Sequence, residues 1–123
     1  MNYIKDNFNS IKANQPKMTY YKLFNSLAEA ENIISIGENR QVKAGETLVC
    51  LSRTSEGFFA IADECPHLGA SLSKGTLNEW NEVICPWHTY RFNLQTGLEC
   101  KHRSDDLTLF EVKIDEEGFS IGV

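Results

Sequence analysis

The fold class of this chain is indicated by two short stretches, CPHLGAS at residues 65–71 and CPWHTYRFN at residues 85–93. Each stretch holds one cysteine and one histidine, as C-x-H in the first and C-x-x-H in the second, and seventeen residues separate His67 from Cys85. A thiolate and an imidazole this close on one loop can reach neighbouring metal atoms. The proline after each cysteine fixes φ and limits the entropy of the loop before metal binds. The two stretches therefore predict a metal site closed by two loops.

Other uses of two cysteines and two histidines compete with a redox cluster. Structural zinc sites accept the same ligand types, but common zinc fingers and ribbons open with two closely spaced cysteines. The alternating order Cys65, His67, Cys85, His88 is unusual for them. A cysteine–histidine nucleophilic site would use one residue of each type and leave the other pair without a role. The residues favour an iron–sulfur cluster, and zinc stays open as the competing interpretation.

The segments around these stretches have the pattern of short β-strands between glycine or polar turns. Residues 20–24 form a further strand candidate, and residues 25–32 contain the helical sequence SLAEAE. Strands this short and close together predict an all-β fold, an antiparallel sandwich or barrel. The remaining predicted strands are residues 41–44, 47–53, 57–62, 83–85, 91–94, 107–114 and 119–123.

The composition indicates one globular domain and disfavours two classes of partner. The chain has 123 residues, 41% of them hydrophobic and 24% charged, which suits one globular domain. We assign this domain to residues 18–123 and treat residues 1–17 as an N-terminal extension whose order is left open. The formal net charge of -5 disfavours nucleic acid and anionic membrane surfaces, both of which attract basic proteins.

The N-terminal sequence MNYIKDNFNSIKANQPK lacks the apolar core of a signal peptide. The chain also contains no run of about 18 apolar residues, the length a membrane-spanning helix needs. We therefore expect a cytoplasmic protein. In a reducing compartment, cysteine and histidine at tight spacing indicate metal binding more often than a disulfide.

The two loop stretches and their surroundings resemble the Rieske iron–sulfur family, whose pattern is C-x-H, a spacer of this length, and C-x-x-H. The resemblance runs from about residue 20 to residue 123 and includes GFFAIADE before the first loop and QTG after the second. It implies the Rieske fold with two cluster-binding loops and one [2Fe-2S] cluster. By this resemblance Cys65 and Cys85 would bind one iron, and His67 and His88 the other, with the histidine edges near solvent. Two neutral histidine ligands raise the reduction potential relative to four cysteines.

Four positions depart from the high-potential members of that family. Ala70 and Trp87 stand where those members carry a pair of cysteines joined in a disulfide, so no such brace can form here. Tyr90 and Phe92 stand where they carry a serine and a tyrosine that donate hydrogen bonds to sulfur. Such donors stabilise the reduced cluster, and their loss lowers the potential. We therefore predict a midpoint of about -150 mV, the bottom of the Rieske range.

The other cysteines and the third histidine lie outside the motif. Cys50, within the apolar run TLVCL, is predicted to be a small core residue, and Cys100 a free surface thiol; a Cys50–Cys100 disulfide is the alternative. His102 is predicted to be solvated. Related ferredoxins often shelter the cluster with a proline-containing loop, but the corresponding residues 102–107 contain no proline. We interpret that segment either as a docking surface or as a solvated turn.

The resemblance implies a Rieske-type ferredoxin, which is a one-electron carrier and not an enzyme on its own. It would take electrons from a ferredoxin reductase and pass them to a terminal oxygenase or other redox enzyme by transient docking, and a monomer is expected. Transient interfaces are small and steered by charge. The alternative is the small subunit of an assimilatory nitrite reductase, a module of the same fold that often lacks the ligands. An oxygenase catalytic subunit needs two further histidines for a mononuclear iron, and only His102 remains.

Overall fold

The computed structural model describes residues 18–123, so the predicted extension at residues 1–17 lies outside the described residues. Helix α2 spans Leu27–Ile33, and a short 3-10 helix spans Leu72–Lys74. Nearly all other regular structure in this range is β. The strands are β1 (Tyr20–Phe24), β2 (Asn39–Ala44), β3 (Thr47–Thr54), β4 (Gly57–Ala62), β5 (Thr76–Leu77), β6 (Glu82–Ile84), β7 (Arg91–Asn93), β8 (Leu109–Asp115) and β9 (Gly118–Gly122).

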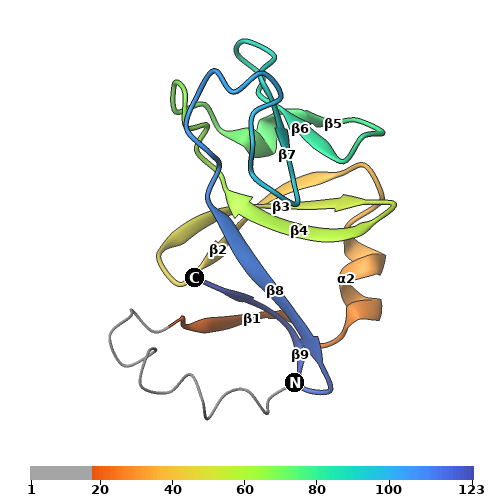
Figure 1. Cartoon of the computed structure of the whole chain (residues 1–123). Coiled ribbons are helices and arrows are strands. Elements are labelled where there is room, and N and C mark those ends of the chain that lie inside the picture. Colours follow the sequence, from red (N-terminus) through yellow and green to blue (C-terminus); the bar gives the residue numbers. More distant parts are fainter. Residues whose placement is uncertain (1–17) are drawn as a thin grey trace, which may run out of the picture.

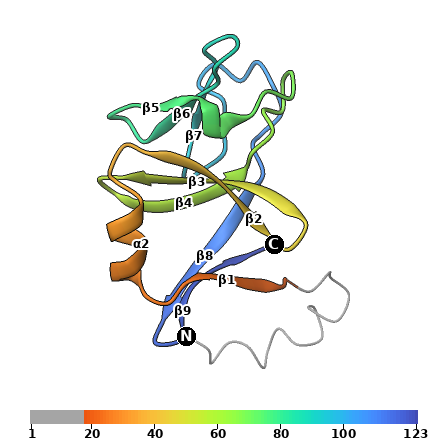
Figure 2. The ribbon, with the colours of Figure 1, turned by 180° about the vertical axis from the view of Figure 1, so that it is seen from behind.

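The strands form two antiparallel sheets, as the sequence pattern predicts. The larger sheet has the order β1-β9-β8-β4-β3-β2, and the smaller one has the order β5-β6-β7. The smaller sheet lies at one end of the molecule, over β3 and β4 (Figure 1). The view from behind shows the larger sheet curling so that β1 and β9 lie at the opposite end (Figure 2). The loops that join β4 to β5, β6 to β7 and β7 to β8 extend beyond the smaller sheet, at the end of the molecule away from β1 and β9 (Figure 1).

The predicted elements agree with the structure to within two residues at either end. Strand β5 and the short 3-10 helix were not predicted. Strand β5 has only two residues, Thr76 and Leu77, which pair with Ile84 and Val83 of β6. Two residues are too few to show a period, so this strand exists only because β6 lies beside it. Within residues 18–123, no helix is long and apolar enough to cross a bilayer.

Within residues 18–123, the buried apolar side chains form two hydrophobic cores. One lies inside the curled larger sheet and contains Phe119, Ile121, Ala30 of helix α2 and Ile34, which directly follows this helix. The other joins the smaller sheet to the larger one, and three cysteines belong to it. These are Cys50, Cys65 and Cys85, each at most 1% exposed.

Cys50 is a core residue, as predicted. Burial raises the pKa of its thiol to about 12, against the opposing effect of a contact with Ser52, so this sulfur is an inert packing atom. All four cysteines are free, so the alternative Cys50–Cys100 disulfide is not formed.

Candidate metal centre

Loop 1 (residues 65–70) leaves strand β4 and is fastened at its base by Asp63. The Asp63 carboxylate accepts hydrogen bonds from the Gln41 amide at 2.7 Å, the Ser71 hydroxyl at 2.6 Å and the Ser73 N–H at 2.8 Å. Although burial opposes ionisation, these donors lower the pKa of Asp63. The Leu72 N–H also donates to the Asp63 carbonyl at 2.6 Å. Residues before and after the loop are thus tied together.

Loop 2 (residues 85–90) joins β6 to β7 and repeats the backbone geometry of loop 1. In each loop the cysteine N–H donates to the carbonyl five residues later, Ala70 or Tyr90, at 2.8 Å. The cysteine carbonyl accepts from the residue four positions later, Gly69 at 2.8 Å or Thr89 at 3.1 Å.

The residue that closes each loop lies in the left-handed region, with φ of 81° at Gly69 and 58° at Thr89. This conformation suits glycine but strains a β-branched threonine. Such strain persists only where the surrounding structure holds it, and it is concentrated at functional sites.

The two loops bring the predicted ligands together. The ligand atoms of Cys65, Cys85 and His88 all lie within 4.8 Å of one another. The fourth residue, His67, is not within this group, but its Nδ1 lies 3.1 Å from His88 Nε2 and the two ring centroids are 4.5 Å apart. The structure thus gathers three predicted ligands and places the fourth in contact with one of them.

The burial of these side chains suits metal binding. Both thiols are buried, whereas His67 is exposed and His88 is half-buried. Burial raises the pKa of the Cys65 thiol, while backbone N–H groups of His67 and Leu68 donate to its sulfur and oppose that rise. Those two N–H groups favour the thiolate, the form that binds metal.

His88 has a further feature that suits metal binding. Its Nδ1 is buried and has no hydrogen-bond partner, and no other side-chain nitrogen or oxygen among the described residues has this combination. Buried polar atoms normally have a partner. Burial, with the charges of His67 and Arg103, lowers the pKa of His88 and favours the neutral imidazole that a metal needs. Two buried thiols beside an unpartnered imidazole nitrogen fit a metal group held between the loops.

Sequence reasoning missed a second group of residues beside loop 2. The carboxylate of Glu99, which is 1% exposed, binds the Arg103 guanidinium through Nε and Nη2. That guanidinium lies 3.7 Å from the ring centroid of Tyr90. Arg103 therefore packs against the site, whereas His102, Asp105 and Asp106 of the same segment are exposed, and a role of residues 102–107 in docking stays a prediction. The one available signal was the opposite charge of Glu99 and Arg103 four residues apart.

Two single-residue predictions near this group have different outcomes. Cys100 is free, as predicted, but only partly exposed, with its sulfur 3.5 Å from Arg91 Nη2 and from Glu99 Oε2. The chain returns toward β7 at this point, which covers the thiol. His102 is exposed, as predicted, and has φ of 57°.

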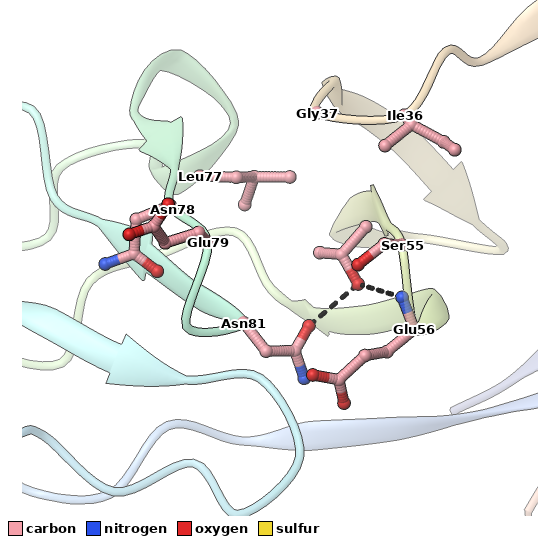
Figure 3. A pocket seen from close by; sticks show the side chains of 9 residues that line it. Ile36, Gly37, Ser55, Glu56, Leu77, Asn78, Glu79 and Asn81 are labelled. Atoms are coloured by element: carbon pink, nitrogen blue, oxygen red, sulfur yellow. Dashed lines mark hydrogen bonds between the residues drawn. The ribbon is translucent and has the colours of Figure 1, made fainter.

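A pocket with a volume of about 230 Å³ lies elsewhere, between the β3–β4 turn and the residues that join β5 to β6. Asn81 and Glu56 are among the residues that line it (Figure 3), and the Thr54 hydroxyl donates to Asn81 Oδ1 at 2.8 Å. None of the four predicted ligands lines it. Its volume is below the range of roughly 300–1,000 Å³ typical of ligand sites. This pocket is therefore separate from the two loops, because no residue of either loop lines it.

Comparison with known families agrees with this geometry. Residues 25–111 match the family of the Rieske [2Fe-2S] domain. The chain belongs to this family. Membership implies a [2Fe-2S] cluster, and it disfavours zinc as the explanation of the paired cysteines and histidines.

Two curated relatives are similar over part of their length. Apoptosis-inducing factor 3 of Mus musculus is 42% identical over 86 residues, which cover 69% of this chain and 14% of that protein. The 3-phenylpropionate/cinnamic acid dioxygenase ferredoxin subunit of Escherichia coli (strain K12) is 36% identical over 69 residues, 55% of this chain and 65% of that protein. The matched part is thus less than two thirds of either relative.

Solved structures show the same fold. The ferredoxin in the complex of reduced oxygenase and oxidised ferredoxin of carbazole 1,9a-dioxygenase is 31% identical with a TM-score of 0.67, covering 83% of this chain and 99% of that one. A chain described as an NADH-dependent nitrite reductase small subunit from Mycobacterium tuberculosis has a TM-score of 0.73 at 16% identity, covering 88% and 97%. The second likeness concerns the fold alone.

Proposed function

We propose that this chain is a Rieske-type ferredoxin that carries one electron at a time from a reductase to a terminal oxygenase or a related redox enzyme. The observation that carries the proposal is the meeting of two buried thiols and two imidazoles at the ends of two matched loops. We also propose that the functional domain is residues 18–123, in a cytoplasmic protein that acts as a monomer. Strands β1 and β9, close to the two ends of this range, pair with each other.

We assign Cys65 and Cys85 as ligands of one iron and His67 and His88 as ligands of the other. The cluster, when bound, supplies a centre that accepts and returns one electron. The core surrounds the two thiols, whereas the His67 ring is exposed, and this difference in surroundings suits two types of ligand that would hold different irons. The unpartnered Nδ1 of His88 supports its assignment.

The surface around the histidines supports a role in docking. Leu68 follows the first histidine and is 57% exposed, and Trp87 precedes the second and is 65% exposed. Large apolar side chains this exposed are favourable contacts for a partner, because covering them removes apolar area from water. A partner seated on these two residues would lie beside the imidazole edges. Electron transfer would then need no substrate cavity.

The choice of partner rests on the relatives. One curated relative is a dioxygenase ferredoxin subunit, and the carbazole 1,9a-dioxygenase ferredoxin occurs in a complex with its oxygenase. We propose a terminal oxygenase as acceptor and a reductase as donor on this basis. The net charge of -5 suits a partner with a basic face. The nitrite reductase small subunit stays the alternative, although a likeness at 16% identity gives it no functional support.

The test is spectroscopic and uses the purified full chain. We expect a coloured protein whose reduced form gives an electron paramagnetic resonance signal with an average g value below that of an all-cysteine cluster. His67→Cys and His88→Cys should each change that signal and the midpoint potential. Cys100→Ser is the matched control, since Cys100 lies outside the loops, and it should change neither.

Two results would count against the proposal. A colourless protein that contains zinc would remove the cluster. Histidine variants with an unaltered spectrum and midpoint would show that these side chains are not ligands. Copurification with a large sirohaem-containing subunit would instead favour the nitrite reductase alternative.

A further inference from the structure

Three side chains form a stack that ends on a predicted ligand. The rings of His67 and Tyr90 are parallel to within 6°, with centroids 4.5 Å apart. The Arg103 guanidinium carbon lies 3.7 Å from the Tyr90 ring centroid. Tyr90 comes from the end of loop 2, and His67 comes from loop 1. The Tyr90 ring thus links the two loops, with a cation 3.7 Å from its centroid.

The cation in this stack is held in place by a buried anion. The Arg103 Nε lies 3.1 Å from both carboxylate oxygens of Glu99, and Arg103 Nη2 binds the same carboxylate. The Glu99 Oε1 also accepts the backbone N–H of Arg103 at 2.6 Å and that of Lys101 at 3.2 Å. A carboxylate with this many donors fixes both the side chain and the backbone of the turn.

The local fold explains why these two residues meet. Glu99 pairs through a β-bridge with Phe92 of strand β7, which buries it against the core. The next residues turn back, with a hydrogen bond of 2.9 Å from the His102 N–H to the Glu99 carbonyl. The left-handed φ of 57° at His102 directs Arg103 back over the bridge. The backbone of this turn therefore directs the Arg103 side chain toward Glu99 and Tyr90.

A guanidinium suits this place better than an ammonium. It is always charged, is weakly hydrated and is flat, so one face can lie on an aromatic ring while its edge binds a carboxylate. Arg103 is a cation over the Tyr90 ring, and that ring lies on the His67 ring. The positive charge of Arg103 therefore favours the more negative, reduced state of a centre that His67 binds. The Glu99 charge offsets part of this effect.

We propose that Arg103 and Tyr90 are positioning residues for the redox centre: the stack fixes the His67 ring across the two loops, and the Arg103 charge raises the reduction potential. This inference rests on the proposed function through one assignment, that of His67 as a ligand. The stack does not donate a hydrogen bond to sulfur, so it differs from the hydroxyl donors that the sequence lacks. It is a separate means of adjusting the same potential.

The test measures the midpoint potential and the electron paramagnetic resonance signal of the purified full chain and three variants. In Arg103→Gln we expect the redox equilibrium to shift at least about threefold toward the oxidised state, about 28 mV at 59 mV per tenfold for one electron. Arg103→Lys keeps the charge but cannot lie flat on Tyr90 or bind Glu99 through two nitrogens. Its midpoint potential should therefore lie between that of the wild type and that of Arg103→Gln. Lys101→Gln is the control, because it removes the same charge from the same turn without touching Tyr90.

The outcomes separate this inference from the proposed function. A wild-type chain without a Rieske signal would remove the proposed function, whatever the variants do. A wild-type chain with that signal, but with an unchanged midpoint in Arg103→Gln, would overturn the inference alone. An equal shift in Lys101→Gln would also overturn it, because charge at any place in the turn would then suffice. If Arg103→Gln does not retain the cluster, Arg103→Lys decides, and a midpoint equal to that of the wild type refutes the stacking contribution.

Discussion

At the scale of single residues, the proposed ligands differ in their exposure. Cys65 and Cys85 are buried in the second core, whereas His67 is exposed and in contact with His88. In the proposed function, the burial of the thiols would keep solvent from the sulfur atoms, and the exposed imidazole would give an electron a short route to a docked partner. The cysteines and the histidines would thus have different roles, the first in the core and the second at the surface.

The potential of the centre is the first residue-scale prediction. Phe92 is fully buried beside Cys65 and Cys85 and has no hydroxyl, and the Tyr90 ring lies flat on His67. We expect a midpoint of about -150 mV, at the bottom of the Rieske range, because neither side chain is placed as a donor to sulfur. A redox titration of the purified chain checks this value. A strongly positive midpoint would show that other donors reach the sulfur atoms.

The Glu99 carboxylate gives a prediction about pH. Hydrogen bonds from the Arg103 side chain, against the effect of burial, lower its pKa from 4.5 to about 2. A lowered pKa stabilises the folded state fully above pH 4.5, and this contribution is lost as the pH falls toward 2. We expect Glu99→Gln to reduce the free energy of unfolding at pH 7 by about 1.5 kcal/mol, the low end for hydrogen bonds to charged groups, because Arg103 is partly exposed.

Denaturant unfolding of the two proteins between pH 7 and pH 3 provides the measurement. The difference between Glu99→Gln and the wild type should shrink below pH 4.5, because Glu99 of the unfolded chain begins to protonate there while the folded protein keeps it ionised. Other groups titrate alike in both proteins and cancel in the comparison. A difference that stays constant over this range would mean that the Glu99 charge is not the source of the stability.

At the scale of the elements, the smaller sheet depends on the larger one for its position. Its strands β5, β6 and β7 have only two or three residues each. An isolated sheet this small is not stable in water. The second core fastens it to the larger sheet, and a buried hydrogen bond from Thr54 at the end of β3 to Asn81 adds a polar link. The position of loop 2 therefore depends on contacts between elements far apart in the sequence.

The link between Thr54 and Asn81 can be tested on its own. Thr54 is 8% exposed and Asn81 is 6% exposed, so Thr54→Val would leave the Asn81 oxygen buried without a donor. We expect a loss of about 1–3 kcal/mol in the free energy of unfolding, the cost of such a group. Thr54→Ser keeps the hydroxyl and is the control. Because neither residue touches the loops, the spectrum of the centre should be unchanged; equal stability of the two variants would refute the prediction.

At the scale of the whole molecule, charge and exposed apolar side chains have separate roles in the proposed docking. The net charge of -5 acts over roughly 10 Å at 0.1 M salt and steers a basic partner before contact. The exposed Leu68 and Trp87 act only after contact. The first effect changes the association rate with salt, and the second changes the lifetime of the complex.

Docking can be measured with cytochrome c, a basic haem protein, as the acceptor. We expect Trp87→Ser to slow its reduction by about fivefold, equivalent to ~1 kcal/mol of contact, without a change in midpoint potential. Trp80→Ser is the matched control, since Trp80 is 63% exposed but lies between β5 and β6, outside the two loops. Rates should also fall as salt rises. Equal rates for the two variants would show that loop 2 is not the contact surface.

The sequence was sufficient for much of this description because the signals concerned are local. Alternation of apolar residues and turn residues predicted the strands of the larger sheet, since a strand shows its period within its own residues. The spacing of Cys65, His67, Cys85 and His88 predicted where to look for a metal site. The structure brings these residues together, and their role as ligands stays a prediction.

Other features depend on which distant residues the fold makes neighbours. Strand β5 forms only beside β6, and the Cys100 thiol is covered only because the chain turns back toward β7. The contact of Arg103 with Tyr90, and that of Tyr90 with His67, needs the turn at His102 and the pairing of both loops. No period or motif encodes such contacts, because they arise from packing and not from the conformation of one segment. The residue types were therefore evident from the sequence, and their spatial relations were decided by the tertiary structure alone.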